Sequence, residues 1–200
     1  MGRLIASKPS VLRSPTHLAW MVTVFVSAGA AHAAVEEESI QRPYVVHAQP
    51  GQTLRQALRA ATPITVDGER FHGYTRWNVR WTFRWWREAS GRCAITEVTT
   101  RLRTEVQLPQ LQGASPAQQA TFDRYLHALS HHEQGHAQFG RDAAHAIDRG
   151  IAESPAAPDC ATLEREANAL GHRVLRDYME RERQYDQHTG HGATQGARLD

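Results

Sequence analysis

Apolar and polar residues alternate along two stretches in the middle of the chain, at the period of two that is typical of β-strands. In residues 76–86 the apolar positions are Trp77, Val79, Trp81, Phe83 and Trp85. After a turn at residues 89–91, residues 94–108 alternate in the same way. We interpret the aromatic row as core, because such side chains favour burial in sheets. The two stretches predict a long antiparallel hairpin with one buried face.

Apolar residues then recur at steps of three and four, which predicts a long amphipathic helix. Ser115 suits its N-cap, and Pro116 suits its first turn. The pattern ends within residues 153–158. Two glycines inside the helix, Gly135 and Gly140, are the places where we expect a bend.

A second long helix follows. Asp159 can cap it, and an apolar stripe extends from Leu163 to Tyr178, opposite a charged face that we interpret as solvated. Glycines at positions 190, 192 and 196 then predict a terminal loop.

Shorter elements precede the hairpin. Residues 34–42, which include three consecutive glutamates, predict a solvated leader, and residues 43–47 a short strand. Thr53 can cap a short helix that Pro63 stops. The predicted fold class is therefore α+β, with an N-terminal antiparallel sheet packed against two long helices in a single domain, residues 34–200.

The first 33 residues have the layout of a secretory signal peptide. Basic residues precede a charge-free run from Leu18 to Val26, and the small side chains of Ala31 and Ala33 suit signal peptidase. The run is shorter than the roughly 20 residues that a membrane span requires. We predict cleavage after Ala33 and a periplasmic or secreted location, with no stable membrane span afterwards.

The charge balance excludes some partners. The predicted signal peptide, residues 1–33, holds three of the 23 basic residues and none of the 21 acidic ones, so the mature chain has a net charge of 20 − 21 = −1. The remaining arginines are interleaved with glutamates and form no basic stripe. We therefore expect neither nucleic acid nor a membrane surface as a partner.

Cys93 and Cys160 would meet an oxidising compartment after export, which predicts one disulfide bond. Neither cysteine has a second cysteine or a histidine at metal-site spacing, so zinc ligation by this pair is disfavoured.

The strongest chemical signal is the HExxH motif His132-Glu133-Gln134-Gly135-His136 inside the first long helix. A spacing of four places both imidazoles on one helix face, where they can bind the same zinc ion. Glu133 is placed to take a proton from the zinc-bound water and pass it to the leaving amine. With 12 histidines in 200 residues, chance predicts roughly 0.05 such motifs. His131 points about 100 degrees away around the helix, and we treat it as a bystander.

A catalytic zinc needs a third protein ligand and an open fourth position. The metzincin extension is absent, because Phe139 and Asp142 stand where it requires a glycine and a histidine. A gluzincin would use a glutamate of the following helix, and Glu164 or Glu166 is available. His145 could join only through a bend in its own helix.

Three segments together resemble a bacterial family of predicted secreted zinc-dependent proteases of unknown function. They are residues 74–79 on the strand, the HExxH motif, and a closing block made of Tyr185-Asp186, Thr189 and His191-Gly192. The resemblance covers roughly residues 74–196. It implies a zincin-like peptidase with His132 and His136 as zinc ligands and Glu133 as general base.

The resemblance leaves the third ligand open. We select His191, because glycines on both sides let a terminal loop fold back over the helix. Glu164 and Glu166 remain alternatives. Tyr185 is the candidate donor to the oxyanion, and Asp186 is a candidate to orient a ligand imidazole.

The predicted function is a periplasmic or secreted zinc metallopeptidase that acts on a peptide or protein substrate. One alternative is a non-catalytic zinc-binding protein of the cell envelope. Another is zinc-dependent hydrolysis of a different bond, such as an amide in cell-wall material. The sequence does not identify the substrate.

Overall fold

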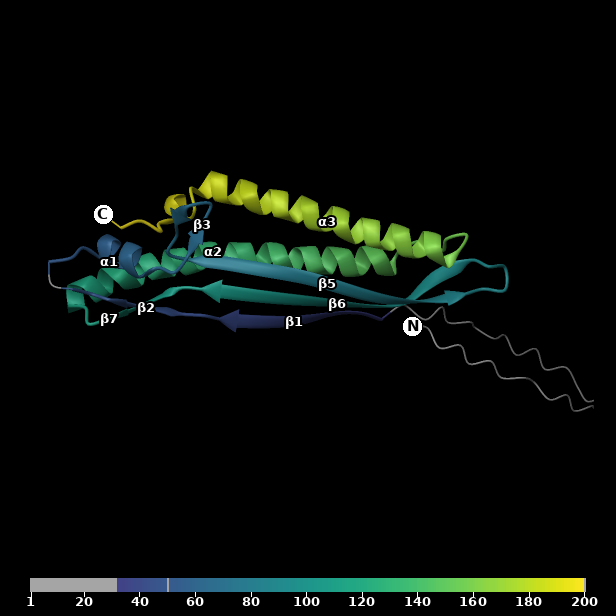
Figure 1. Cartoon of the computed structure of the whole chain (residues 1–200), viewed down its shortest axis with the longest axis horizontal. Coiled ribbons are helices and arrows are strands. Elements are labelled where there is room, and N and C mark those ends of the chain that lie inside the picture. The colour runs from purple at the N-terminus through teal and green to yellow at the C-terminus, as the bar shows by residue number, and fades with distance from the viewer. Residues whose placement is uncertain (1–31, 50, 200) are drawn as a thin grey trace, which may run out of the picture. The chain divides into compact units, whose positions relative to one another are not determined.

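A three-stranded sheet forms the base of the fold in the computed structural model, which describes residues 32–49 and 51–199 (Figure 1). The strand order is β1 (His32–Gln41), β6 (Cys93–Gln107) and β5 (Tyr74–Arg87). Because β5 and β6 pair antiparallel along their lengths, the predicted hairpin is confirmed.

One face of the sheet is buried, as the alternation predicts. On β6, Val98, Thr100, Leu102, Thr104 and Val106 are buried at alternate positions, and Cys93 at its start is buried as well. On β5, Val79 is buried and Trp77, Trp81 and Phe83 are half-buried. The register shifts between Arg84 and Trp85, and Trp85 beyond the shift is 40% exposed. Assigning Trp85 to the core was therefore wrong, because this irregularity interrupts the alternation.

The first strand differs from the sequence prediction. Residues 34–42 were expected to be a solvated leader, but β1 pairs parallel with β6, so the sheet is mixed rather than wholly antiparallel. Arg101 donates to Glu36 at 2.7 Å, and Arg103 donates to Glu38 at 3.2 Å. The arginines of β6 thus accommodate a glutamate run that has no strand-like apolar pattern of its own.

Two short strands extend the parallel arrangement. β2 (Tyr44–His47), where a strand was predicted, pairs with β7 (Pro109–Gln112). Between β2 and β5 lie helix α1 (Leu54–Ala61), capped by Thr53 as predicted, and a small hairpin of β3 (Thr65–Val66) and β4 (Glu69–Arg70).

Both long helices are confirmed, and they cover the buried face of the sheet (Figure 1). α2 (Pro116–Ala152) packs on the strands, and α3 (Cys160–Thr189) lies along α2 and reaches β5. Their N-caps are the predicted residues: Ser115 accepts from the Gln118 amide, and Asp159 accepts from the Thr162 amide. The α+β class is therefore confirmed.

Glycines bring the helices close to the aromatic row of β5. A Cβ on Gly140 of α2 would lie 2.7 Å from Cγ of Trp77, and one on Gly171 of α3 would lie 2.5 Å from Cζ2 of Trp81. Real Cβ atoms do not approach that closely, so both contacts require glycine. We expected Gly140 to bend α2, but here its contribution is close packing within one continuous helix.

Two of the apolar clusters formed by the described residues lie along α2. The first, which we call the α1 cluster, comprises Tyr44, Val46, Leu54, Ala57, Leu58, Ile64, Phe122, Tyr125, Leu129 and Leu199. The second, the sheet cluster, comprises Val79, Val98, Leu102, Ala143, Ala144, Ile147, Ile151 and Ala167. The HExxH motif lies on the stretch of α2 between them.

The predicted disulfide joins Cys93 at the start of β6 to Cys160 at the start of α3, with their Cα atoms 5.1 Å apart. It closes a loop of 67 residues, which is worth about 4 kcal/mol in the chain-entropy model. The bond therefore ties the beginning of α3 to the end of the sheet.

The predicted signal peptide, residues 1–33, lies outside the described residues apart from the backbone of His32 and Ala33 in β1. Within residues 32–199, apart from position 50, no helix is long and apolar enough to cross a membrane.

Candidate metal centre

Three ligand atoms converge between α2 and α3. His132 and His136 of α2 are 3% and 7% exposed, and each turns its Nε2 atom toward Asp186 of α3. The Oδ1 atom of Asp186 lies 3.2 Å from Nε2 of His132 and 3.1 Å from Nε2 of His136. The two Nε2 atoms are 3.1 Å apart. These atoms form a nearly equilateral triangle.

The triangle fits a tetrahedral metal ion. Bonds of about 2.0 Å in a tetrahedron place ligand atoms about 3.3 Å apart, close to the three separations found here. Within the described part of the chain, this group has the geometry of a metal site. Three protein ligands leave a fourth position for a water or a substrate.

Glu182 fixes the orientation of His136. Its Oε1 atom lies 3.0 Å from Nδ1 of His136 and accepts a second hydrogen bond, of 3.0 Å, from the indole of Trp77. Because an ionised carboxylate can only accept, Nδ1 of His136 carries the proton. Nδ1 is thus committed to Glu182, so a metal ion would bind at Nε2, which gives up its own proton when the metal binds.

Gln195 and Tyr185 fix the orientation of the other imidazole, that of His132. Gln195, in the 3-10 turn η1 (Ala193–Gln195), places Oε1 2.9 Å from Nδ1 of His132, and its amide nitrogen donates to the Tyr185 hydroxyl at 3.0 Å. The Tyr185 ring stacks on His132 with an interplanar angle of 13°. Tyr185 also donates to the His132 carbonyl at 3.3 Å. Tyr185 and Gln195 thus orient the ring of His132 through stacking and through the hydrogen bond at Nδ1, which leaves Nε2 facing Asp186.

The charges around the triangle favour a cation. Burial lowers the pKa of His136, but hydrogen bonds to Asp186 and Glu182 outweigh that effect and raise it to about 10. Burial would raise the pKa of Asp186, yet hydrogen bonds from His132 and His136 hold it well below its usual range. A site with this much negative potential is suited to a divalent cation.

Glu133 lies beside the triangle without being part of it. It is 4% exposed, and Thr75 of β5 donates to its Oε2 atom at 2.7 Å. The other oxygen, Oε1, lies against Gly73, where a Cβ would come within 2.5 Å. Burial raises the pKa of Glu133, and the hydrogen bond from Thr75 opposes that rise. A carboxylate with a raised pKa is a stronger general base at neutral pH.

A pocket of ≈ 460 Å³ opens onto these groups, and its lining includes His132, Glu133, His136 and Asp186. His72 and Tyr125 also line it, and Nδ1 of His72 lies 2.7 Å from the Tyr125 hydroxyl. The metal-binding group, Glu133 and further polar side chains therefore share one solvent-connected space.

The structure brings Asp186 to the two imidazoles in the place predicted for His191. His191 lies next to it, with Nδ1 3.4 Å from Oδ1 of Asp186, but it is half-exposed and outside the triangle. The reason is that α3 continues to Thr189 and carries Asp186 to the site itself. Glu164 and Glu166 are exposed near the other end of α3, about 30 Å away along the helix.

Sequence reasoning assigned no role to Glu182 or Gln195. A usable signal existed for Glu182, since it precedes Asp186 by four residues and therefore shares its helix face. This carboxylate pair faces the histidine pair of α2, which has the same spacing. Gln195 offered no such signal, because its contact depends on how the segment after α3 folds back.

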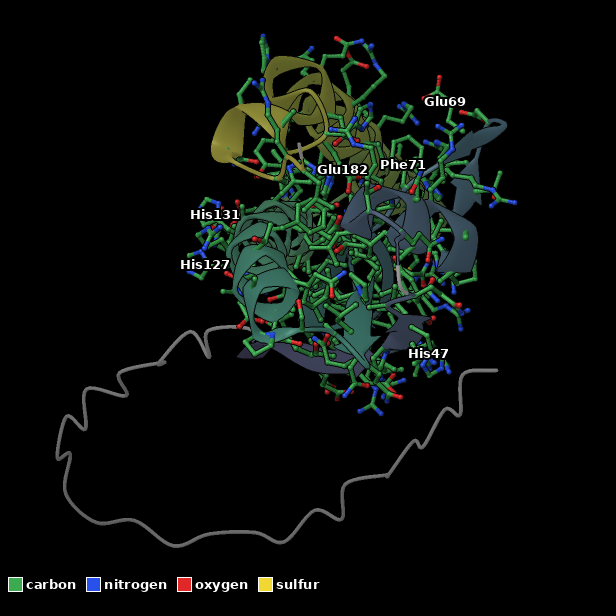
Figure 2. All side chains as sticks on the ribbon, turned by 90° about the vertical axis from the view of Figure 1, so that its left-hand side faces the viewer. His47, Glu69, Phe71, His127, His131 and Glu182 are labelled. Atoms are coloured by element: carbon green, nitrogen blue, oxygen red, sulfur yellow. A yellow bond between two sulfur atoms is a disulfide. The ribbon has the colours of Figure 1, made fainter. Side chains whose placement is uncertain are left out.

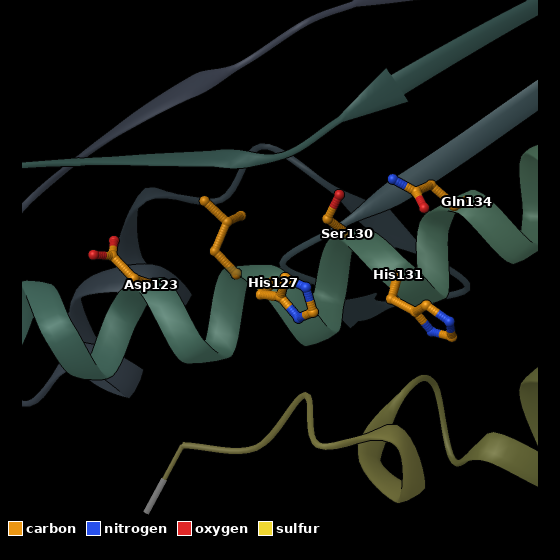
Figure 3. A pocket seen from close by; sticks show the side chains of 6 residues that line it. Asp123, His127, Ser130, His131 and Gln134 are labelled. Carbon is orange, nitrogen blue, oxygen red and sulfur yellow. The ribbon is translucent and has the colours of Figure 1, made fainter.

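A second hollow lies on the outer side of α2, away from this centre (Figure 3). It has a volume of ≈ 390 Å³, and all of its lining residues belong to α2: Asp123, Leu126, His127, Ser130, His131 and Gln134. Figure 2 shows His127 and His131 on the side of the molecule opposite Glu69. His131 is thus a bystander to the metal-binding group, as predicted from the helix period.

The family model of a bacterial protein of unknown function, DUF922, matches residues 41–192. The matched span contains the triangle, Glu133 and Glu182. No curated protein and no solved structure matches the chain.

Replacing Asp186 tests the third ligand. We expect the wild type to hold about one zinc ion after loading and dialysis, and Asp186→Ala to lose it, because two imidazoles alone make a weak site. His191→Ala is expected to keep the ion, and Glu166→Ala is the matched control on α3. Metal content by mass spectrometry checks this. Loss in His191→Ala with retention in Asp186→Ala would restore His191 as the ligand.

Removing Glu182 tests how His136 is held. Glu182→Ala leaves Nδ1 of His136 without its acceptor, and we expect zinc affinity to fall about 10- to 100-fold. Glu180→Ala, an exposed carboxylate of the same helix that pairs with Arg183, is the control. Competition with a chromogenic chelator measures both affinities. Equal affinities would show that Glu182 does not support the ligand.

Proposed function

The chain belongs to the DUF922 family of bacterial proteins of unknown function, and we propose that it is a zinc-dependent metallopeptidase that hydrolyses peptide bonds. One observation carries the proposal. One face of α2 presents two buried histidine Nε2 atoms and the Glu133 carboxylate to one pocket, where Asp186 supplies a third ligand atom.

The donor set favours zinc in a catalytic role. Two imidazole nitrogens and one carboxylate oxygen suit zinc, and catalytic sites have three protein ligands where structural sites have four. The group identified among the described residues supplies three, and it lines an open pocket. His132, His136 and Asp186 would hold the ion.

The bound ion would act as a Lewis acid that polarises the scissile carbonyl and lowers the pKa of water. Glu133 takes a proton from the attacking water and delivers it to the nitrogen of the leaving amine. Thr75 donates to Oε2 of Glu133, so the other oxygen, Oε1 beside Gly73, is the one that accepts the proton. Burial keeps this carboxylate basic enough to accept it.

Charge that develops on the carbonyl oxygen needs a hydrogen-bond donor. We predicted Tyr185, but its hydroxyl is directed at the His132 carbonyl and at Gln195. His72 is the better candidate, because its ring lines the pocket. We assign this role to His72 and keep Tyr185 as a positioning residue for His132.

The hydrogen bond between His72 and Tyr125 indicates which ring nitrogen of His72 carries the proton. Burial raises the pKa of Tyr125, so its hydroxyl stays protonated, and burial lowers the pKa of His72, so its imidazole is neutral. Among the described residues, Nδ1 of His72 is the acceptor within reach of that hydroxyl. Tyr125 therefore donates to Nδ1, and His72 carries its proton on Nε2, where it can serve as a donor.

A periplasmic or secreted location is part of the proposal. The disulfide between Cys93 and Cys160 needs an oxidising compartment, which supports export. The leader-like first 33 residues support it as well. Export would place the pocket among envelope or extracellular proteins.

Glu133→Gln separates hydrolysis from zinc binding alone. We expect the variant to retain zinc and to lose turnover about 10²- to 10⁴-fold, because the amide cannot accept the proton. Cleavage of unfolded casein, followed by mass spectrometry, measures it, with a chelator-treated wild type as reference. A wild type that binds zinc and cleaves no peptide bond would favour the non-catalytic envelope protein.

His72 variants test the oxyanion donor. His72→Phe should lower kcat about 10²-fold with zinc content unchanged, whereas His72→Gln, which keeps an N–H donor, should recover part of the loss. Tyr125→Phe should have a smaller effect, because it removes the hydrogen bond that keeps the proton of His72 on Nε2 but leaves the imidazole in place. Steady-state kinetics with thermal unfolding as a control measures this. A larger kcat loss in Tyr185→Phe than in His72→Phe would return the role to Tyr185.

A further inference from the structure

Large apolar side chains are exposed at the mouth of the metal pocket. In the described part of the chain, the exposed large apolar residues are Val45, Val66, Tyr74, Trp85, Trp86 and Met179. Three of them line the pocket: Val66, Tyr74 and Met179. They come from three different elements, β3, β5 and α3, and α3 is far from the two strands in sequence. Their exposure at one place is therefore a feature of the pocket and not of one amphipathic element.

The β3–β4 hairpin forms one wall. Its tight turn uses positive φ angles at Asp67 (50°) and Gly68 (84°), and it carries Val66 and Arg70 into the lining. Phe71 follows at its base, with its ring centroid 4.9 Å from that of His191. Figure 2 shows Glu69 of this hairpin at the outer edge of the molecule, with Phe71 nearer to Glu182.

Helices α3 and α2 also contribute apolar side chains to the lining, Met179 and Leu129 respectively. Met179 of α3 is 59% exposed, and it precedes Glu182 by three residues on the same helix face. Leu129 of α2 is buried and precedes Glu133 by four residues. The apolar walls are thus continuous with the carboxylate and the ligands.

The contrast between the two parts of the pocket indicates its occupant. Acidic groups and imidazoles surround the place where the bond would break, while the exposed part of the lining combines Val66, Tyr74 and Met179 with Arg70 and Arg183. Single exposed apolar residues are ordinary, but a patch of them at a pocket with converging polar groups is typical of a binding site. A sugar would present mainly hydroxyl groups to these walls, whereas a leucine or phenylalanine side chain would bury apolar surface against them.

We propose that the pocket binds an extended peptide with a large apolar side chain next to the scissile bond, and that this side chain packs against Val66, Phe71, Tyr74 and Met179. This inference rests on the proposed peptidase function and names its substrate class. It favours protein segments that are unfolded or exposed over amides of cell-wall sugars.

The test measures binding apart from cleavage. Labelled hexapeptides of alanine and serine, each with one leucine, phenylalanine, alanine or aspartate at a scanned position, are titrated against zinc-loaded Glu133→Gln by fluorescence anisotropy. Zinc-loaded wild type is then used to locate the cleaved bond in the same peptides. We expect leucine or phenylalanine beside that bond to strengthen binding about tenfold or more over alanine.

A matched pair of variants locates the contact. In the Glu133→Gln background, Met179→Asp should abolish the preference for leucine over alanine. Ala169→Asp places the same charge on an exposed position of the same helix, about 15 Å away. This control should leave the preference unchanged.

Cleavage without any apolar preference in binding would overturn the inference and leave the peptidase function standing. Preferential binding of leucine peptides that the wild type never cleaves would overturn both the peptidase function and the placement of the side chain beside a scissile bond. A preference that survives Met179→Asp would overturn the assignment to these walls.

Discussion

The contact between Asp186 and the two imidazoles of α2 is the interaction on which the site depends. Burying a carboxylate or an imidazole without a partner is costly, so each group tolerates burial only because the others are there. The contact exists only if α3 lies in one register along α2. Trp77 and Trp81 of β5 help to set that register, because their indoles donate to Glu182 and Asn168 of α3 at 3.0 and 2.9 Å. Trp77 and Trp81 therefore pack against the core and also support the helix that carries Asp186.

Local rules predicted most of the fold. The period of two gave the β5–β6 hairpin, the period of 3.6 gave α2 and α3, and the capping residues gave their starts. The same locality explains why His132, Glu133 and His136 could be identified, since their relation depends on one helix alone. The strand β1 was not predicted, because its glutamates lack strand-like alternation. They are stabilised by arginines of β6, about 65 residues away in sequence.

The third member of the metal-binding group was harder to predict, because its position depends on tertiary packing. His191 was selected from the flexibility of a glycine-flanked loop, whereas Asp186 was considered only as a residue that orients a ligand imidazole. With α3 continuing to Thr189, Asp186 and Glu182 are carried along one helix face to the histidines. Which face of α3 meets α2 depends on the packing of both helices against the sheet, and a periodic pattern alone does not specify it.

The hydrogen bond between Gln195 and His132 determines when, during synthesis of the chain, the metal-binding group can be completed. The two histidines are made early, but the groups that complete and orient the triangle come 50 and 63 residues later, at Asp186 and Gln195. Leu199 then packs into the α1 cluster beside Tyr44, near the other end of the described chain. A chain that emerges from its N-terminus can build the hairpin and α2 first, yet it cannot offer a complete site to metal until nearly all of the domain has emerged. The metal-binding group therefore stays incomplete in any partly emerged chain, and binding of an ion would have to follow the synthesis of nearly the whole domain.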